Sequence, residues 1–458
     1  MDSIEVSFGS SEILRPLDAG LKSEGPVLEW NELSLPDSAR GCRLDAVERQ
    51  TRLAHGRVRG VFRDFEIDSG YQPIYSLAHR RPVGYEALAS VRTPDGRPGA
   101  LSDVFESSMV GGVDEVFIDR LCRNVHLRNF PSAPGDTAGW LFLNVHPHVI
   151  LRGPEHGPYF AALLERYRFP AHRVVIEIVE QAIDDEARLA EAVRYYKDLG
   201  CLVAIDDFGA GGSGIGRIWR LAPQFVKFDR SMLEEARHSA AARRILSRYV
   251  ALVHECGSLT LLEGIESEQD ALIAIETGFD LVQGYLLGQP AGDPRNSNGC
   301  GAIPALCVRY KNSVQAEMQR QRQRLAGPLH DFRQAARLLE SDIDMARACV
   351  RMLGRTEVRR CYLLDADGRQ IGANLLPTAQ ALSLDPRLTP FLDGTDAVWT
   401  RRDYFRGAME RPGEIYVSRP YLSMTDARMC ITLSIALPDE SRAGPVVLAC
   451  DIDCPDDA

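Results

Sequence analysis

The chain of 458 residues lacks any apolar run that approaches the length of a membrane span, which is about 20 residues for a helix. It begins Met-Asp-Ser-Ile-Glu, with an acid where a secretory signal peptide carries basic residues. We therefore expect a cytoplasmic protein with no membrane insertion.

An excess of positive charge is also missing. The 64 acidic residues outnumber the 53 lysines and arginines, and the formal net charge is -11. An acidic chain is a poor non-specific partner for the phosphate backbone of a nucleic acid. Binding to a nucleic acid polymer is therefore not expected. A small anionic nucleotide is a different case, because a bound cation reverses the local charge.

The eleven cysteines include no CxxC pair and no Cys/His spacing typical of zinc sites, so zinc is not expected, and we interpret them as reduced, mostly buried thiols. His146-Pro-His148 suggests a metal pair, but we interpret these side chains as loop histidines just past a strand. The basic run Arg320–Arg324 is interpreted as a solvated linker helix rather than a nucleic-acid patch. The glycines between 209 and 214 lack the Lys-Ser/Thr of a P-loop.

The length exceeds that of one ordinary domain and suits a barrel plus a second domain. Residues 1–43 have Gly, Ser and Pro punctuation with no sustained period, which predicts a poorly ordered N-terminal extension. We divide the rest into a barrel at 44–300, linker helices at 301–358 and a small domain at 359–458.

Between Tyr71 and Pro290, short apolar or β-branched runs alternate with amphipathic stretches. The predicted helices include Asp184–Leu199, Ser231–Cys256 and Glu266–Thr277. Alternating strands and helices indicate an α/β fold with a parallel sheet, and about eight units fit a TIM-like (β/α)8 barrel. The predicted strands are Tyr71–Ser76, Pro82–Leu88, Trp140–Val145, Arg173–Ile178, Leu202–Ile205, Phe225–Phe228, Leu259–Leu262 and Asp280–Gln283.

Polar side chains mark the end of nearly every predicted strand: Glu86, Asn144, Glu177, Asp206, Asp207, Lys227, Glu263 and Gln283. A single acid at a strand end is usually a turn residue or a helix cap. That interpretation does not explain the set, because carboxylates that converge on one barrel mouth repel each other without cations. Oxygen ligands with no thiol or imidazole favour Mg²⁺ or Mn²⁺. Two such ions about 3.5–4 Å apart would clamp a phosphodiester for attack by water.

An ordered series of motifs resembles the EAL domain family, roughly half the chain being covered. The motifs are Tyr85-Glu-Ala-Leu88, Leu143-Asn-Val145, Glu177-Ile-Val-Glu180, Asp206-Asp-Phe-Gly209, Val226-Lys-Phe-Asp229, Glu263-Gly-Ile-Glu266 and Gln283-Gly-Tyr285. The resemblance implies an enzyme that hydrolyses cyclic di-GMP to linear pGpG with two Mg²⁺ or Mn²⁺ ions. The alternative is a non-catalytic cyclic di-GMP receptor that signals to a protein partner. A homodimer is also implied.

The resemblance also implies a role for each matching residue. Asp206 would bridge the two metals, Lys227 would hydrogen-bond the attacking water, and Gln283 would orient a metal-bound water. Glu180 would brace the loop after Asp207. The implied ligands are Glu86, Asn144, Glu177 and Asp206 for the first metal, with Asp206, Asp207 and Glu263 for the second. The implied substrate contacts are Gln72, Leu88, Arg92, Asp229 and Gln283.

The sequence departs from the family pattern at three places. The phosphate-binding Arg two residues after the EAL leucine is Ser90 here, and Arg92, on the same strand face, is expected to substitute in part. Val179 replaces a threonine. The loop Asp207–Gly214 has lost a threonine and a tyrosine and gained glycines, which predicts a more mobile loop. These changes affect substrate affinity, basal rate and dimer coupling, and leave the ligand set intact.

The C-terminal region resembles Cache or PAS-like sensory domains at Arg401–Phe405, Pro420–Ser423 and Leu448–Asp451. We expect a small α+β domain, antiparallel in character, with a turn at Asp365-Ala-Asp-Gly368. It either binds a small zwitterionic or carboxylate ligand or acts as a ligand-free dimerisation module. Its predicted strands are Cys361–Leu364, Ile415–Arg419, Cys430–Ala436 and Val446–Ile452.

One apolar stripe recurs every three or four positions before this domain, which predicts one helix. We expect the stripe to pack on its own domain, and packing on a second chain is the alternative. The stripe consists of Phe332, Ala335, Leu339, Ile343, Ala346, Val350 and Leu353.

Overall fold

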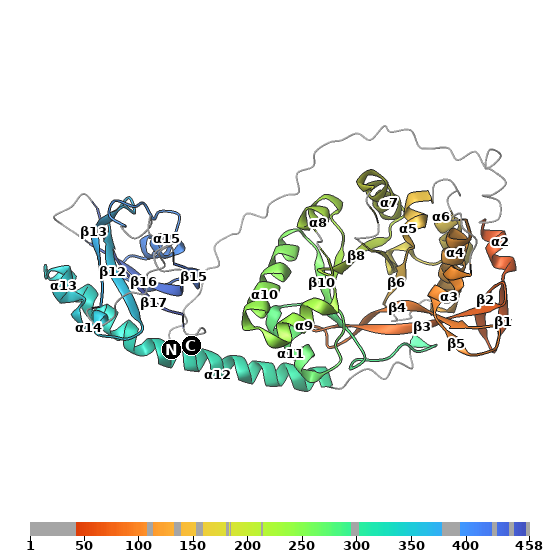
Figure 1. The fold of residues 1–458 in the computed structure, drawn as a ribbon, viewed down its shortest axis with the longest axis horizontal. Coiled ribbons are helices and arrows are strands. Elements are labelled where there is room, and N and C mark those ends of the chain that lie inside the picture. Colours follow the sequence, from red (N-terminus) through yellow and green to blue (C-terminus); the bar gives the residue numbers. More distant parts are fainter. Residues whose placement is uncertain are drawn as a thin grey trace, which may run out of the picture. The chain divides into compact units, whose positions relative to one another are not determined.

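The computed structural model forms two compact units that divide between Val308 and Arg309 (Figure 1). It describes residues 43–107, 113–131, 139–152, 159–179, 183, 185–211, 214–294, 302–377, 394–423, 428–438 and 444–454. The extension predicted for 1–43 falls outside these ranges except at its last residue, and the predicted four-part division of the chain stays a prediction. In the described ranges, no helix is both long enough and apolar enough to cross a bilayer.

Eight strands close the barrel of the first unit, because β3 pairs with both β4 and β11. The predicted TIM-like barrel is therefore confirmed as an eight-stranded α/β barrel. Its strands are β3 (Phe65–Ser76), β4 (Arg81–Arg92), β6 (Trp140–Asn144), β7 (Val174–Val179), β8 (Leu202–Phe208), β9 (Phe225–Phe228), β10 (Leu259–Leu262) and β11 (Leu281–Gln283).

One barrel strand runs against the others, which corrects the expectation of an all-parallel sheet. Strand β3 is antiparallel to β4 and to β11, whereas the remaining barrel pairs are parallel. The physical reason is the connection: only residues 77–80 separate β3 from β4. A parallel pair needs a crossover of a dozen or more residues, and so short a link permits only a hairpin.

The β3–β4 hairpin is longer than the sequence predicted. The predicted strands began at Tyr71 and ended at Leu88, whereas the observed strands begin at Phe65 and end at Arg92. The extra length continues the sheet past the barrel, where β1 (Thr51–Ala54), β2 (Arg57–Phe62) and β5 (Pro98–Gly99) join it (Figure 1).

Helices follow the barrel strands. The predicted helix Ser231–Cys256 is in fact two helices, because Ser239 has an extended backbone and its hydroxyl accepts a hydrogen bond from the Ala242 amide at 3.1 Å. The described helices of this unit are α2 (Leu44–Arg49), α3 (Leu101–Glu106), α4 (Val113–Asn129), α5 (Pro147–Arg152), α6 (Tyr159–Tyr167), α7 (Glu186–Asp198), α8 (Ile215–Leu221), α9 (Arg230–His238), α10 (Ala240–Glu255) and α11 (Glu268–Thr277).

The barrel interior is filled by a compact layer of apolar side chains, one from each of seven strands. They are Ile74, Phe142, Val175, Ala204, Phe225, Leu261 and Leu281, all nearly inaccessible to water. Two larger apolar clusters lie on the outside of the strands, where the helices cover them. This apolar layer packs directly beneath the side chains at the strand ends.

The second unit is built on an antiparallel sheet, as the sequence predicted, with strand order β13-β12-β17-β16-β14 and β15 paired to β16. Helix residues pack on both faces: Phe332 and Met352 belong to one apolar cluster, and Phe405 belongs to another. Its strands are β12 (Val358–Leu364), β13 (Gln370–Leu375), β14 (Tyr416–Val417), β15 (Tyr421–Leu422), β16 (Met429–Leu437) and β17 (Val446–Asp453).

The apolar stripe predicted as one helix is split in the structure. Helix α12 (Ala302–Glu340) ends before Ile343, and the short helices α13 (Met345–Ala348) and α14 (Val350–Leu353) follow. Phe332 and Ala335 pack in the core of their own unit, as expected, whereas Val350 is 63% exposed. The stripe is interrupted at Asp344, whose carboxylate accepts a hydrogen bond from the Arg347 amide and caps a new helix, α13.

The predicted turn at Asp365-Ala-Asp-Gly368 is present between β12 and β13. The Asp365 carboxylate accepts hydrogen bonds from the amides of Asp367 and Arg369, both at 2.9 Å. Gly368 has a φ of +73°, which glycine adopts without the strain of a side chain.

Candidate active site

Each barrel strand places one polar side chain at the same mouth of the barrel, two residues from its interior position. Alternate residues of a strand face the same side, so the residue two beyond Phe142 is Asn144 and the residue two beyond Val175 is Glu177. On the reversed strand β3 the polar residue comes two before Ile74. We call the set the polar ring: Gln72, Glu86, Asn144, Glu177, Asp206, Lys227, Glu263 and Gln283.

Strand β4 has Gly84 where the other strands have an interior apolar side chain. A Cβ at Gly84 would lie 3.0 Å from a ring carbon of Phe142 and 3.0 Å from the Trp140 carbonyl oxygen. The absence of a side chain lets the neighbouring strand approach closely. Glu86, two residues on, therefore completes the ring.

Lys227 lies at the centre of the carboxylates of the polar ring and is 1% exposed. Its Nζ is 2.7 Å from Oε1 of Glu177 and 2.7 Å from Oε1 of Glu263. The same atom is 3.1 Å from Oδ1 of Asp206 and 3.9 Å from Oε2 of Glu86. One ammonium thus faces four carboxylates.

The amides of the ring hold Glu86 in place. Nε2 of Gln283 donates to Oε2 of Glu86 at 2.6 Å and to Oε1 of Gln72 at 3.1 Å. Nδ2 of Asn144 donates to Oε1 of Glu86 at 2.9 Å. Both oxygens of Glu86 are therefore oriented by side chains from β6 and β11.

A bulge in β8 brings two consecutive carboxylates toward the site. The register of β8 against β9 shifts between Ile205 and Phe208, and Asp207 has a φ of +58°. Consecutive residues of a regular strand point to opposite faces, whereas a bulge re-aims one of them. Ligand atoms of Asp206, Asp207 and Glu263 consequently lie within 4.8 Å of one another.

Negative charge exceeds positive charge in this site. Burial raises the pKa of Glu177 well above its usual range, and burial raises the pKa of Glu263 to about 7 against the opposing effect of Lys227. Burial, then Asp206, raises the pKa of Asp207. Burial disfavours the ammonium of Lys227, but the carboxylates around it outweigh burial and hold its pKa well above the usual value.

The donor set fits hard divalent cations. Within the described part of the chain, no group donates a hydrogen bond to Oε2 of Glu177 or to Oε1 of Gln283, although both atoms are buried. Oxygen ligands without sulfur or imidazole are the set that Mg²⁺ and Mn²⁺ prefer. A cation would compensate both the unpaired oxygens and the excess negative charge.

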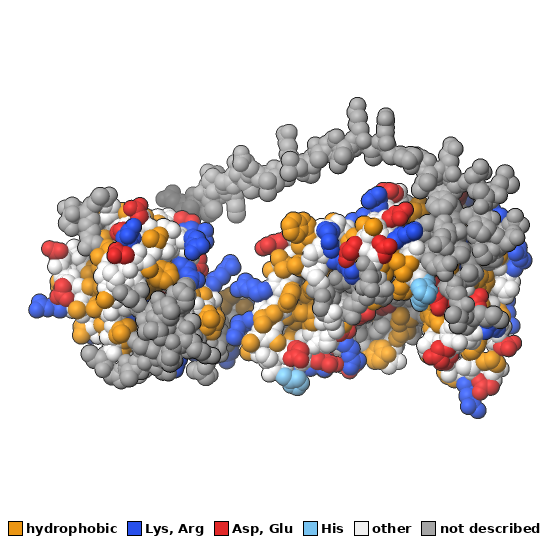
Figure 2. All heavy atoms as spheres, turned by 45° about the horizontal axis from the view of Figure 1, so that its top comes forward, with side chains coloured by type: hydrophobic (Ala, Val, Ile, Leu, Met, Phe, Trp, Pro, Cys, Tyr) orange, Lys and Arg blue, Asp and Glu red, His pale blue; other side chains and the backbone are white. Residues whose placement is uncertain are grey.

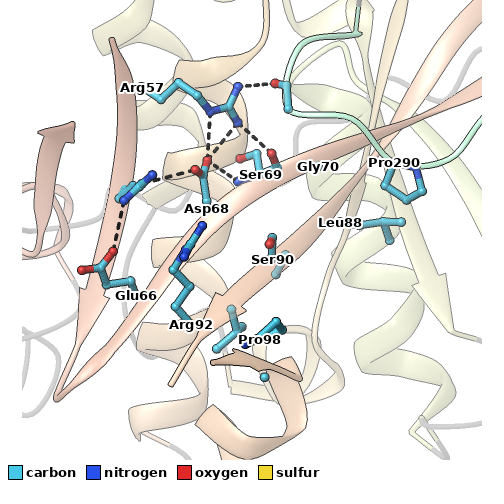
Figure 3. Close-up of a pocket in the computed structure, with 15 residues that line it drawn as sticks. Arg57, Glu66, Asp68, Ser69, Gly70, Leu88, Ser90, Arg92, Pro98 and Pro290 are labelled. Carbon is cyan, nitrogen blue, oxygen red and sulfur yellow. Dashed lines mark hydrogen bonds and ion pairs between the residues drawn. The ribbon is translucent and has the colours of Figure 1, made fainter. Parts of the chain in front are cut away.

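A pocket of about 500 Å³ extends along the β3–β4 hairpin beyond the polar ring (Figure 3). Leu88, Ser90 and Arg92 line it from the same face of β4 as Glu86, at two-residue steps. Ser90 therefore lies about 14 Å along the strand from Glu86. Pro290 closes the pocket from the segment after β11.

Charged side chains gather at the far end of this pocket (Figure 3). The guanidinium of Arg57 donates to Oδ1 of Asp68 at 2.8 and 3.1 Å, and Arg59 lies 3.3 Å from Glu66. Arg92 makes no ion pair with any residue in the described ranges and is exposed. Of the pocket's arginines, Arg92 is the one whose charge is left for an anionic ligand.

The other predicted residues are placed as follows. Asp229 caps α9, where its carboxylate accepts from the Ser231 amide at 3.0 Å, and its charge helps to raise the pKa of Asp207. Gln72 donates to the Gly288 carbonyl at 3.3 Å. Glu180 lies outside the described residues, as do residues 212 and 213, so the bracing role and the loop mobility stay predictions.

The outer wall of the pocket, which includes Arg57 and Asp68, was not predicted from the sequence. Strand β2 begins at Arg57, and the sequence carries alternating charges on either side of the turn at Arg63. Two short runs of alternating residues joined by a turn are typical of a hairpin, so the sequence alone could have predicted this one. That Pro290 lines the same pocket as this hairpin could not be predicted from spacing along the sequence.

The fold and the site define a class: a closed α/β barrel whose strand ends carry an oxygen-donor site suited to divalent cations. Residues 57–290, just over half of the chain, match the EAL domain family. The chain therefore belongs to the EAL domain family, and its Glu86-Ala87-Leu88 motif joins the polar ring to the pocket.

Two curated relatives match the barrel. The cyclic di-GMP phosphodiesterase RocR of Pseudomonas aeruginosa is 29% identical over 229 residues, which are 49% of this chain and 57% of that protein. The EAL-domain containing protein YkuI of Bacillus subtilis is 28% identical over 225 residues, 48% of this chain and 54% of that protein. The chain thus spans little more than half the length of these relatives.

A solved structure matches more of the chain. The crystal structure of YkuI in complex with substrate c-di-GMP and calcium has a TM-score of 0.70 to this structure at 22% identity. The match covers 85% of this chain and 96% of that one. Likeness at this identity shows a shared fold, and its extent takes in part of the second unit.

Proposed function

We propose that this protein is a metal-dependent phosphodiesterase that hydrolyses cyclic di-GMP to linear pGpG. The observation that carries the proposal is the polar ring, whose Glu86, Glu177, Asp206 and Glu263 surround Lys227, together with Asp207 beside Asp206 and Glu263. The relative RocR is a cyclic di-GMP phosphodiesterase, which supports the same reaction.

The proposed cations are two Mg²⁺ or Mn²⁺ ions. Glu86, Asn144, Glu177 and Asp206 would hold one, and Asp206, Asp207 and Glu263 would hold the other. When bound, such ions activate water and stabilise the charge on a phosphodiester under attack. The three carboxylates of the second set already lie within 4.8 Å of each other, so little rearrangement is needed.

The chain's own residues would orient the reactants. Lys227 is fixed by its carboxylate neighbours and offers an ammonium hydrogen bond to the attacking water and to charge that develops on the phosphoryl oxygens. Gln283 is fixed by its hydrogen bonds to Gln72 and Glu86, so its free Oε1 would accept from a water in the site.

The pocket along β4 would take the half of the dinucleotide that does not react. A cyclic dinucleotide has two phosphates, and only one meets the polar ring. Arg92 would contact the second phosphate in place of the arginine that Ser90 has replaced, and Leu88 would pack on the ligand. Ser90 offers only a neutral hydroxyl, so we expect weaker substrate binding than in a protein with arginine there.

The second candidate function is a receptor that binds cyclic di-GMP without hydrolysis and signals to a protein partner. It is favoured by Ser90 and by the glycine-rich loop after Asp207, which change substrate contacts and not the ligand set. The complete polar ring favours catalysis over this alternative.

Self-association into a homodimer is part of the proposal. Helix α10 exposes Ile245, Tyr249 and Leu252 on one face, and Trp219 of α8 is 79% exposed. Apolar side chains are visible in this part of the barrel unit (Figure 2). Contiguous exposed apolar residues mark association surfaces, and α8 is the next helix after β8, the strand that carries Asp207.

The C-terminal unit would act as a sensory or dimerisation domain of the Cache/PAS type. Its predicted ligand contacts include Asp451, which is buried, paired with Arg360 and bonded to Thr432 at 2.8 Å. The side chains of Tyr404 and Tyr421 stack beside it, with ring centroids 6.0 Å apart. This acid is satisfied within the domain, which weighs toward the ligand-free alternative.

The test is incubation of the purified protein with cyclic di-GMP and Mg²⁺ or Mn²⁺, followed by chromatography of the nucleotides, with EDTA in a parallel sample. We expect pGpG to appear only with metal, and Glu86→Gln to abolish it because a metal ligand is lost. Glu106→Gln, exposed on α3, is the matched control and should keep the wild-type rate. Nucleotide binding without product under both metals would move the protein to the receptor class.

A further inference from the structure

A second cluster of metal-ligating side chains lies next to β6, outside the polar ring. Glu115 comes from the first turn of α4, His146 follows β6, and His148 is the second residue of α5. One ligand atom from each of the three lies within 4.8 Å of the others. We call Glu115, His146 and His148 the histidine cluster.

The fold holds His146 in a fixed orientation. Its ring stacks on Phe105, with centroids 4.8 Å apart, and its backbone amide donates to Oδ1 of Asp119 at 2.9 Å. The His148 amide donates to Nδ1 of His146 at 3.3 Å, so this ring nitrogen carries a lone pair. The contact is long, and a metal ion competes with it at little cost.

His148 and Glu115 bring their ligand atoms together away from water. Nδ1 of His148 forms an ion pair with Oε2 of Glu115. Both atoms are inaccessible to solvent, and neither makes a hydrogen bond of normal geometry with a described residue. The imidazole nitrogen and the carboxylate oxygen therefore already converge on one point, and a cation that binds both would replace the contact between them.

We propose that the histidine cluster is a binding site for a transition-metal cation of the Zn²⁺ or Ni²⁺ type. Two imidazoles and one carboxylate are the donors of such ions, with the remaining positions open to water. The polar ring offers oxygen donors only, which suit Mg²⁺ and Mn²⁺. The chain therefore has two sites that differ in metal preference.

Spacing along the sequence did not reveal this site, because the pair His146-Pro-His148 has no third ligand nearby in the chain. Glu115 stands 31 positions before His146 and is brought to it by the packing of α4 beside β6. His146 lies in the loop after β6, as expected, whereas His148 lies in α5, and the proposed metal role goes beyond that interpretation. His146 lies two positions after Asn144 of the polar ring. Metal binding at the histidine cluster nevertheless does not depend on any activity at the polar ring.

X-ray absorption of the zinc-loaded protein, prepared without a histidine tag, tests the proposal. The polar ring contains no histidine, and among the described residues the histidine cluster is the candidate metal group with two imidazoles, so scattering from two imidazoles around zinc reports this cluster. We expect two imidazole ligands in the wild-type protein. Zinc surrounded by oxygen donors only would overturn the proposal.

Variants then locate the site. His146→Ala and His148→Ala should each weaken Zn²⁺ binding measured by calorimetry in excess Mg²⁺ by more than about tenfold and remove imidazole scattering. Glu115→Gln keeps the shape of the side chain and should weaken binding through loss of the anionic ligand, which guards against a histidine variant that fails to fold.

The matched control is His254→Ala. His254 is exposed to a similar extent as His148, and its Nε2 lies 2.8 Å from Oδ2 of Asp280, but no described residue adds a third ligand atom to this pair. This variant should bind Zn²⁺ as the wild-type protein does. Equal weakening in His254→Ala and His148→Ala would show surface adsorption and overturn the proposal.

Discussion

Lys227 is surrounded by four carboxylates and almost completely buried, so its charge depends on those partners for compensation. A buried ion that loses its partners is strongly destabilising, and the same holds for the carboxylates if the ammonium is removed. The residue thus serves the fold of the metal-free protein as well as the proposed chemistry.

Replacing Lys227 by Met should lower the turnover of cyclic di-GMP roughly 100-fold or more, because one aligned electrostatic donor is lost. It should also lower the melting temperature of the metal-free protein, with partial recovery when Mg²⁺ is added. Lys197→Met is the control, since Lys197 binds the carbonyl oxygens at the end of α8 and touches no ring residue. A wild-type rate in Lys227→Met would refute the role.

His126 on α4 lies outside the polar ring and makes the stability of the folded protein depend on pH. It is buried and its Nδ1 lies 2.8 Å from the Ser69 hydroxyl, and burial lowers its pKa to about 4. The folded state therefore holds the neutral ring. Stability from this group is present above about pH 6.5, the usual histidine value, and is lost as pH falls toward 4.

We expect the loss to be on the order of 3 kcal/mol at pH 4. Urea unfolding at pH 7 and pH 4 measures it, and His126→Gln, which cannot be protonated, should lose less stability over this interval than the wild-type protein. His254→Gln, at an exposed position, should follow the wild-type curve. Identical curves for all three proteins would exclude the assignment.

At the scale of elements, the barrel and its mouth were predictable because strand period and strand ends obey simple geometry. The ring residues from Glu86 to Gln283 all came from that reasoning. The reversal of β3 was not predicted, because every strand was assumed to belong to a strand–helix–strand crossover. The four residues between Ser76 and Arg81 are too few for such a crossover. The split after Ser239 was missed since apolar spacing continues across it.

The bulge in β8 supports a prediction about Asp207. Asp207→Asn should remove a proposed metal ligand and leave the fold intact, because asparagine tolerates a positive φ. Asp207→Val should unfold more easily than Asp207→Asn by about 1–2 kcal/mol, since a β-branched residue is strained at this φ. Thermal denaturation of the two variants without metal makes the comparison. Equal stabilities would mean that the bulge does not constrain this position.

For the whole molecule, the two structural units allow a clean separation. The barrel core includes Ile303 and Leu306, so a chain that ends at Val308 keeps the apolar side chains that complete it. The antiparallel character of the second unit was predictable from its short strands and turn. Its partner or ligand was not, because Asp451 and Arg360 satisfy each other inside the domain.

A protein truncated after Val308 should fold and keep metal-dependent hydrolysis, and its rate or its oligomeric state should differ from those of the full chain. Nucleotide chromatography and analytical ultracentrifugation measure the two quantities. The matching control is the full chain with Val350→Ala, an exposed position of the second unit. If truncation changed neither quantity, the second unit would have no regulatory role.

The ammonium of Lys227 acts as a counterion that the protein carries with it. A carboxylate site that depended wholly on captured metal would lose its structure whenever the metal became scarce. Here the covalently attached charge keeps the emptied site assembled. Under the proposed metal-dependent function, scarcity would silence existing molecules without destroying them, and a returning supply would restore their output within the time of ion binding rather than that of protein synthesis.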